Sequence, residues 1–188
     1  MSHGMRHLNL VLLTAIGIFS MLVPIAPARA AETVAVTING PSNNQTFSAR
    51  LDGSPLPESL GQATARFGLP ASRRRYGPEG GINCRASWPA MHIMGTFTVA
   101  LGGLHNGCIA GAGTMMLTLG SGWRTDTGLA VGQLVADLRR IYPHATAKGN
   151  RWALVRYFYG AGFYVTELGA VTSRGRITAL TVAGVPDE

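Results

Sequence analysis

Charged residues are scarce in this chain of 188 residues, since Asp, Glu, Lys and Arg together make up only 13% of it. Lysine occurs once, at Lys148, so the formal net charge of +7 rests almost wholly on arginine. With 46% hydrophobic residues the chain is as apolar as an ordinary globular domain, which excludes disorder driven by charge. The 25 glycines follow no triplet period, which excludes a collagen-like helix. The length is that of one domain, or of two small repeats that share a core.

Common catalytic signatures are also missing. The sequence has no G-x-S-x-G nucleophile elbow, no H-E-x-x-H zinc motif and no GxxxxGK[ST] phosphate loop. His92, His105 and His144 have neither the spacing of metal ligands nor an acidic cluster beside them. We therefore predict no metal site and no cofactor.

The N-terminus has the three parts of a secretory signal peptide. Arg6 precedes an apolar run over residues 8–23, and the small-residue pattern Ala28-Arg29-Ala30 follows. We predict cleavage after residue 30, so that the mature chain has 14 basic residues against nine acidic ones, a net charge of +5. This pattern predicts a secreted or extracytoplasmic protein of the periplasm or cell envelope.

The alternative for the same segment is a permanent membrane anchor. The apolar run contains Asn9, Thr14 and Ser20, and at about 16 residues it is shorter than the roughly 20 residues of a spanning helix. No cysteine stands near the cleavage site, so the signal for bacterial lipid attachment is absent. We therefore expect contact with the membrane only through the uncleaved signal peptide.

Export decides how the two cysteines are interpreted. Cys84 and Cys108 both lie in the mature part, and in an oxidising compartment an even pair predicts a disulfide. A disulfide between Cys84 and Cys108 would reduce the conformational entropy of the unfolded chain. In the entropy model this stabilises the folded state by about 3–4 kcal/mol.

The first half of the mature chain predicts a strand and a helix. Val34, Val36 and Ile38 alternate with polar or small residues, which indicates a half-buried strand, and we interpret residues 31–54 as a loosely attached N-terminal strand and loop arm. Apolar residues at helical spacing predict a short helix from Pro57 to Phe67. The arginines at 73–75 are expected in an exposed basic loop.

The remaining chain predicts strands around a second helix. Alternating patterns indicate strands at 93–101 and 115–119, with a turn at 102–107. A helix is expected from Gly132 to Tyr142, with an apolar face that includes Leu134 and Leu138. Three further strands are expected at 152–159, 163–172 and 177–185.

The two halves resemble each other in sequence. Leu60-Gly61-Gln62 opens the first predicted helix, and Val131-Gly132-Gln133 opens the second. The predicted fold class is α+β, with short helices packed on a twisted antiparallel sheet, and the pattern favours two tandem repeats, over 55–125 and 126–188.

These short motifs carry a resemblance to known families. Phe67-Gly68-Leu69-Pro70 resembles the helix end, and Leu129-Ala130-Val131-Gly132 the helix start, of the repeat unit in the β-lactamase-inhibitory-protein group. The small-protein-A outer-membrane-assembly lipoproteins use a related unit. The stretch from Cys84 through Trp88-Pro89 to Cys108 is also similar to exported proteins of actinobacteria that have no assigned activity. The resemblance implies the helix-plus-sheet fold and secretion.

One segment has features of a cysteine enzyme. His92 and the stretch Leu104-His105-Asn106-Gly107-Cys108 resemble the nucleophile region of L,D-transpeptidases, which would make Cys108 a thiolate activated by a histidine. The pattern departs from that family, since Asn106 is inserted and Ala110 stands where an arginine is expected. A hairpin turn with a disulfide cysteine explains the same residues, and we favour it.

Arginines supply the candidate binding residues. Their forked donors suit phosphate and carboxylate groups, although solvated charge on loops and on a helix surface explains them equally. The candidates for anion binding are Arg73, Arg74, Arg75, Arg139, Arg140, Arg174 and Arg176.

The sequence favours an exported, non-enzymatic binding or envelope-associated protein. Its expected partner is an anionic envelope polymer or a protein, and nucleic acid is not expected because few aromatics accompany the arginines. The alternatives are a secreted inhibitor of a hydrolase, which would use the sheet face with Trp152 and nearby aromatics such as Tyr157 as anchors, and the cell-wall transpeptidase.

Overall fold

The structure is a computed structural model that describes residues 32–39, 46–77, 82–99, 108–159 and 163–183. Two short helices accompany two sheets, so the fold is α+β with the sheets predominating. The elements are β1 (Glu32–Asn39), β2 (Thr46–Leu51), β3 (Ser54–Pro55), α1 (Leu60–Phe67), β4 (Ser72–Tyr76), β5 (Asn83–Trp88), the 3₁₀ turn (Pro89–Met91), β6 (Ile93–Thr98), β7 (Gly113–Leu119), β8 (Trp123–Thr125), α2 (Val135–Ile141), β9 (Thr146–Lys148), β10 (Arg151–Tyr159), β11 (Phe163–Ser173) and β12 (Arg176–Ala183).

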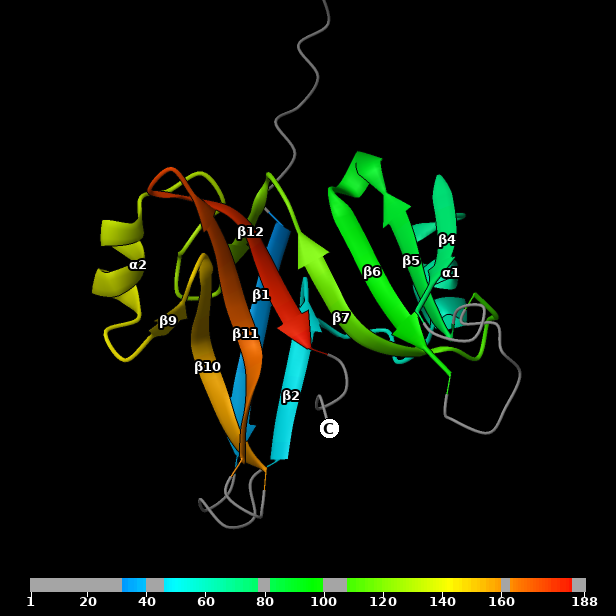
Figure 1. The fold of residues 1–188 in the computed structure, drawn as a ribbon, viewed down its shortest axis with the longest axis horizontal. Coiled ribbons are helices and arrows are strands. Elements are labelled where there is room, and N and C mark those ends of the chain that lie inside the picture. The colour runs from blue at the N-terminus through cyan, green and yellow to red at the C-terminus, as the bar shows by residue number, and fades with distance from the viewer. Residues whose placement is uncertain (1–31, 40–45, 78–81, 100–107, 160–162, 184–188) are drawn as a thin grey trace, which may run out of the picture.

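The larger sheet has eight strands in the order β4-β5-β6-β7-β12-β11-β10-β9. Each half is an antiparallel meander of four consecutive strands that follows one helix, and the halves join where β7 pairs with β12. In Figure 1, α1 lies at the β4 end of this sheet and α2 at the β9 end. The order of elements is thus the same in both halves.

The smaller sheet, β3-β2-β1-β8, is formed largely by the N-terminal segment. Strand β1 pairs antiparallel with β2 and parallel with β8, and Val34 and Leu51 are fully buried in the common core. The prediction of a loosely attached arm is therefore wrong, because this segment contributes core side chains and a central strand of the sheet.

Helix α1 is fixed by capping at its start. Ser59 Oγ accepts a hydrogen bond from the backbone N–H of Gln62 at 3.2 Å, and Gln62 Oε1 accepts one from the N–H of Glu58 at 2.9 Å. Leu60 and Ala63 face the core, and Gly68, with a φ of 84°, ends the helix. The predicted helix is confirmed, but it begins three residues after Pro57.

Helix α2 is shorter than the predicted 132–142 segment. Gly132 has a φ of 100°, which a helix cannot contain, and its N–H donates to the Ile177 carbonyl at 2.8 Å. The helix consequently starts at Val135, with Leu138 fully buried and Leu134 45% exposed. Leu138 is confirmed as a core residue, and the assignment of Leu134 to the same face is wrong.

The strands predicted after residue 92 are confirmed as β6, β7, β10, β11 and β12. The predicted basic loop at 73–75 is instead the edge strand β4, which pairs with β5 over Ser72–Tyr76. An edge strand with three exposed arginines lacks the apolar alternation by which strands are recognised.

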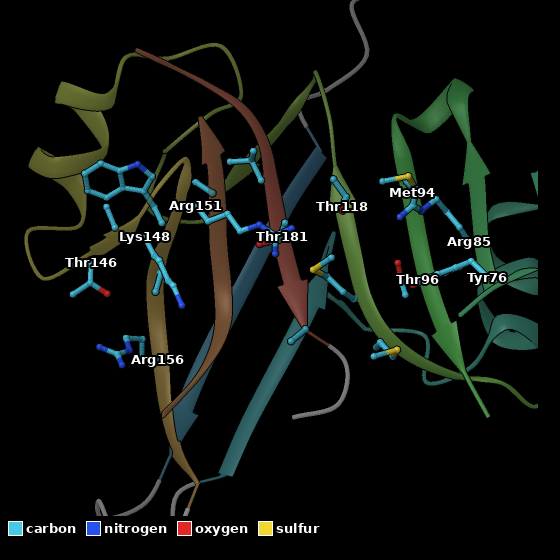
Figure 2. Close-up of a pocket in the computed structure, with 18 residues that line it drawn as sticks. Tyr76, Arg85, Met94, Thr96, Thr118, Thr146, Lys148, Arg151, Arg156 and Thr181 are labelled. Atoms are coloured by element: carbon cyan, nitrogen blue, oxygen red, sulfur yellow. The ribbon is translucent and has the colours of Figure 1, made fainter. Parts of the chain in front are cut away.

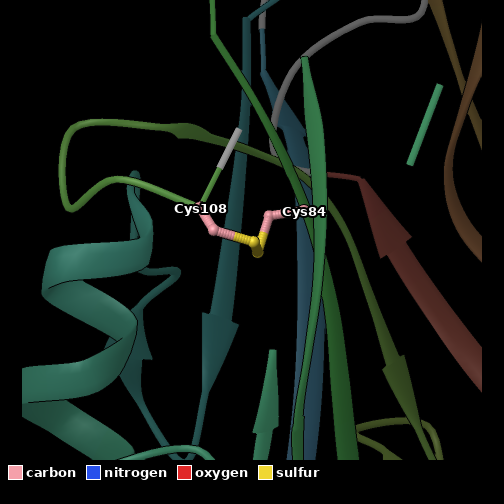
Figure 3. The surroundings of a disulfide bond; sticks show 2 residues. All are labelled: Cys84 and Cys108. Carbon is pink, nitrogen blue, oxygen red and sulfur yellow. A yellow bond between two sulfur atoms is a disulfide. The ribbon is translucent and has the colours of Figure 1, made fainter. Parts of the chain in front are cut away.

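The disulfide between Cys84 and Cys108 is confirmed, with 4.9 Å between the two Cα atoms (Figure 3). Cys84 lies in β5, and Cys108 lies in the segment that leads into β7. That segment also contacts the start of α1, since the N–H groups of Leu60 and Gly61 donate to the carbonyls of Ala112 and Ala110 at 2.9 and 2.7 Å. The cross-link therefore connects the sheet to the segment that holds the helix N-terminus.

Candidate functional site

The open face of the eight-stranded sheet is hollowed (Figure 2). The hollow has a volume of about 940 Å³, and residues from all eight strands line it. Its opposite face carries the core, including Cys84, Phe97 and Leu180. Because side chains alternate across a strand, the residues between these core positions point into the hollow.

Directly paired residues form a continuous row across this face of the sheet, and five of the eight line the hollow. Antiparallel partners project from the same face, so the register of successive pairs traces the row from one edge of the sheet to the other. The row consists of Ser72, Ser87, Met94, Thr118, Thr181, Gly169, Ala153 and Thr146. None of these side chains carries a charge, so the middle of the face is neutral.

A first cationic pair, Arg74 and Arg85, lies at the β4–β5 end of this face. The two residues are direct cross-strand partners, two positions from the neutral row. The Arg85 guanidinium lies 5.3 Å from the centre of the Tyr76 ring, which keeps the side chain over the face. Arg85 and Tyr76 both line the hollow.

A second cationic pair, Lys148 and Arg151, lies at the β9–β10 end. These residues are also direct cross-strand partners, and both line the hollow. The strand register places them on the other side of the neutral row from Arg74 and Arg85, so the two pairs are diagonal to each other. Figure 2 shows Arg85 and Arg151 at opposite ends of the sheet. Arg156 adds a further positive charge farther along β10.

Neither cationic pair is balanced by a carboxylate within the part of the chain that the structure describes. The described residues that line the hollow include no Asp or Glu, and no described carboxylate forms a salt bridge with Arg74, Arg85, Lys148 or Arg151. Like charges directly opposite each other on neighbouring strands destabilise a sheet. Two such pairs on one face form an arrangement that a bound anion would stabilise.

The arginines predicted from the sequence do not form one site. Of the triplet in β4, Arg74 belongs to the first cationic pair, whereas Arg73 and Arg75 are partners of the core residues Ala86 and Cys84 and project from the opposite face. The three side chains therefore do not share one face, because a strand sends alternate side chains to opposite faces.

The other predicted arginines have local structural contacts. Arg139 of α2 lies 5.3 Å from the Trp152 ring centre, and Arg140 forms a salt bridge with Asp137 at 3.1 Å. Arg174 has a φ of 51° in the turn between β11 and β12, and Arg176 donates to the Gly132 carbonyl at 3.0 Å. The β11–β12 turn and α2 thus hold these side chains away from β4, at the other end of the sheet.

The described residues do not support the alternative interpretation as a cysteine enzyme. Cys108 is bonded to Cys84, which leaves no thiolate at that position. Phe97, the partner of Cys84, lies near the end of β6, whereas His92 precedes the start of this strand. The four extended steps from Ile93 to Phe97 alone span about 13 Å. His105 lies outside the described residues. This arrangement does not supply a histidine-activated nucleophile.

Sequence reasoning missed the cations that line the hollow. Arg85 stands between the apolar residues Cys84 and Ala86, an alternation that could have placed it on the outer face of a strand. The pairing of Lys148 with Arg151 depends on the tight turn at Gly149-Asn150, which only the folded chain reveals.

Among the described residues no group of three His, Cys, Asp or Glu side chains is arranged to hold a metal ion. Neither helix in these ranges is long and apolar enough to cross a membrane. Comparisons of the chain with protein-family models, with curated proteins and with solved structures find no match. Its function is therefore argued from its own residues.

Proposed function

We propose that the protein is an exported, non-enzymatic binding protein that holds an anionic polymer of the cell envelope in the hollow of its eight-stranded sheet. The observation that carries the proposal is the presence of two directly opposed cationic pairs on one concave face, with no carboxylate among the described residues that line it. Arginine guanidinium groups donate in a fork that matches phosphate and carboxylate oxygens.

Export is proposed from the N-terminal segment, which lies outside the described residues. The Cys84–Cys108 disulfide is consistent with an oxidising compartment, since such bonds are rare in cytosolic proteins. A cell-envelope polymer with repeated anionic groups is the class of ligand that such a protein would meet after export.

We also propose that the two halves are tandem repeats related to the unit of the β-lactamase-inhibitory-protein group. The shared order of one helix and four antiparallel strands supports this proposal. The Gly-Gln motif does not, because Gly61 lies within α1 whereas Gly132 precedes α2 with a positive φ. The support for a duplication is therefore the topology that the two halves share, and not the Gly-Gln motif.

Inhibition of a hydrolase is the alternative use of the same face. Of the aromatic anchors expected for it, Trp152 is engaged with Arg139, and the side chains of the others lie outside the described residues. The charge of the hollow favours a polyanion over a partner held mainly by aromatic anchors.

The test is titration of the purified protein with poly(glycerol phosphate), a phosphodiester polymer without bases, at increasing salt. We expect binding whose logarithmic affinity falls linearly with the logarithm of salt concentration, because phosphate binding releases counterions. Replacing both cationic pairs with glutamine should lower the affinity at least tenfold and flatten the salt dependence.

The matched control is Arg73→Gln/Arg75→Gln, which removes two equally exposed charges from the opposite face of β4. We expect this variant to retain nearly the affinity of the unmodified protein. Equal losses in the control and in the Arg74→Gln/Arg85→Gln variant would show that net charge alone causes binding. Absence of binding by the unmodified protein would refute the proposal.

A further inference from the structure

We propose that the two cationic pairs are the two ends of one binding site, so that its ligand is a linear phosphodiester polymer of polyol or sugar units that bridges both. This inference rests on the proposed function and adds to it the length and the chemical class of the ligand. Three observations support it: the distance between the pairs, the neutral surface between them, and the contacts that the nearby aromatic rings already make with arginines.

The two pairs are too far apart for one small anion. Arg85 in β5 and Arg151 in β10 are separated by five inter-strand steps, which corresponds to about 24 Å along the sheet at the usual spacing of strands. Curvature of the sheet shortens the direct path, and the diagonal placement of the pairs lengthens it. A single phosphate can therefore reach one pair only, whereas an extended chain can reach both.

The surface between the pairs suits uncharged units that bear hydroxyl groups. Thr96, Thr118 and Thr181 line the hollow, and none of their hydroxyl groups has a hydrogen-bond partner within the described part of the chain. Thr118 and Thr181 are direct partners at the junction of the two halves, midway between the cationic pairs. Each threonine hydroxyl can donate and accept, which matches the hydroxyl groups of a polyol or sugar.

Methionines give this part of the surface an adaptable apolar floor. Met94, Met115 and Met116 line the hollow beside the threonines. The flexible thioether side chain adjusts to irregular shapes, so the carbon backbone of a polyol unit can pack here without a rigid complementary pocket. Phosphate groups would then meet the cationic pairs, and the uncharged units would meet the neutral row.

The aromatic residues of the hollow argue against a nucleic acid. Proteins that hold single strands without sequence preference stack bases on open aromatic rings. Tyr76 already lies against Arg85, and Trp152 lies against Arg139, each at 5.3 Å between guanidinium carbon and ring centre. Each of these two described rings therefore has one face already covered by a guanidinium group, which leaves less aromatic surface for base stacking and favours a phosphodiester polymer without bases.

The first experiment measures affinity against chain length, with linear glycerol-phosphate oligomers from the dimer upward. Short oligomers should bind weakly and with little dependence on length. Affinity should rise steeply once a single chain spans both pairs, by about 100-fold or more, because the second contact becomes intramolecular. An affinity that rises only in proportion to the number of phosphate groups would overturn the two-ended site while leaving the proposed function intact.

The second experiment removes one end at a time. Arg74→Gln/Arg85→Gln and Lys148→Gln/Arg151→Gln should each reduce the affinity for a long oligomer to nearly that for a short one. Each should hardly change the affinity for the short oligomer, which still has the other end available. Loss confined to one of the two variants would show a single local anion site and would overturn the inference.

Variant folding is checked by the thermal transition, and Arg73→Gln/Arg75→Gln again serves as the control for lost charge.

Single-stranded DNA and poly-glutamate, each long enough to span both pairs, test the chemical class of the ligand. We expect both to bind at least tenfold more weakly than the glycerol-phosphate polymer. Equal binding of the DNA would refute the preference for a polymer without bases, and equal binding of poly-glutamate would refute the assignment to phosphodiesters.

Discussion

At the scale of single residues, Thr114 and Thr125 are both buried but differ in what their hydroxyl groups contact. Thr114 Oγ1 has no hydrogen-bond partner. Thr125 Oγ1 accepts a hydrogen bond from the N–H of Leu129 at 3.0 Å and is paired with Thr127 Oγ1 at 2.8 Å. A buried hydroxyl without a partner destabilises the folded state, whereas a satisfied one contributes to its stability.

We predict opposite effects of the same substitution at these two positions. Thr114→Val should leave the free energy of unfolding unchanged or raise it by about 1 kcal/mol, because it removes an unsatisfied polar atom from the core. Thr125→Val should lower it by about 1–3 kcal/mol, because the Leu129 N–H loses its acceptor. Urea denaturation measures both, and a substantial loss of stability in Thr114→Val would contradict the prediction.

In β4, the sheet face on which a side chain lies also changes from one residue to the next. Arg73, Arg74 and Arg75 look equivalent in the sequence, yet only Arg74 shares a face with Arg85. The prediction of an exposed basic loop was wrong because residues 72–76 form a strand, in which consecutive residues point to opposite faces. Only the recognition of β4 as a strand separates Arg74, on the proposed binding face, from Arg73 and Arg75 on the opposite face.

At the scale of elements, α2 is held to the sheet by a narrow apolar contact. Leu138 is fully buried, whereas Leu134 immediately precedes the helix and remains 45% exposed. The carbonyl and N–H groups around Leu134 instead connect to the β11–β12 turn, since the Val135 N–H donates to the Gly175 carbonyl at 3.0 Å. The helix is therefore placed by the fully buried Leu138, by Ile141 packed against the core, and by backbone contacts at its start.

We predict that Leu138→Asp unfolds the domain or strongly destabilises it. An unpaired buried carboxylate costs several kcal/mol, a large share of a typical stability of about 5–15 kcal/mol. Leu134→Asp makes the same chemical change at a partly exposed position and should cost about 1 kcal/mol or less. Melting temperatures of the two variants provide the measurement, and equal shifts would show that burial of α2 does not determine the outcome.

At the scale of the whole molecule, the disulfide connects parts that are distant in sequence. Cys84 lies in β5 and Cys108 in the segment that accepts hydrogen bonds from the start of α1. Both cysteines are therefore necessary for the same cross-link. While the bond is present, Cys108 has no free thiol that could act as a nucleophile.

We predict that Cys84→Ala, Cys108→Ala and the double variant lose similar stability, up to about 3–4 kcal/mol, because each change removes the same restriction on the unfolded chain. The unreduced protein should contain no thiol that reacts with an alkylating reagent. Stability is measured by denaturant titration and thiol content by alkylation. One rapidly reacting thiol at Cys108, with Cys84→Ala fully stable, would instead support the cysteine enzyme.

The sequence by itself determined the local elements of this protein. Period-two alternation identified β6, β7 and the three C-terminal strands, and helical spacing identified α1 and the core position of Leu138. The pairing of the two cysteines also followed from the sequence, because only one intramolecular disulfide is possible between two cysteines. These features depend on the spacing of neighbouring residues or on the number of cysteines, and both can be read directly from the sequence.

Only the tertiary structure decided the candidate site. The two cationic pairs come from β4, β5, β9 and β10, at opposite ends of one sheet, and they share a face because β7 pairs with β12. That pairing joins strands about 60 residues apart and depends on the complementarity of entire meanders, which no local pattern encodes. The N-terminal strand was likewise central rather than peripheral because β1 pairs with β8, far along the chain. Local periodicity specifies which side chains share a strand face, and long-range pairing specifies which of those faces become one surface.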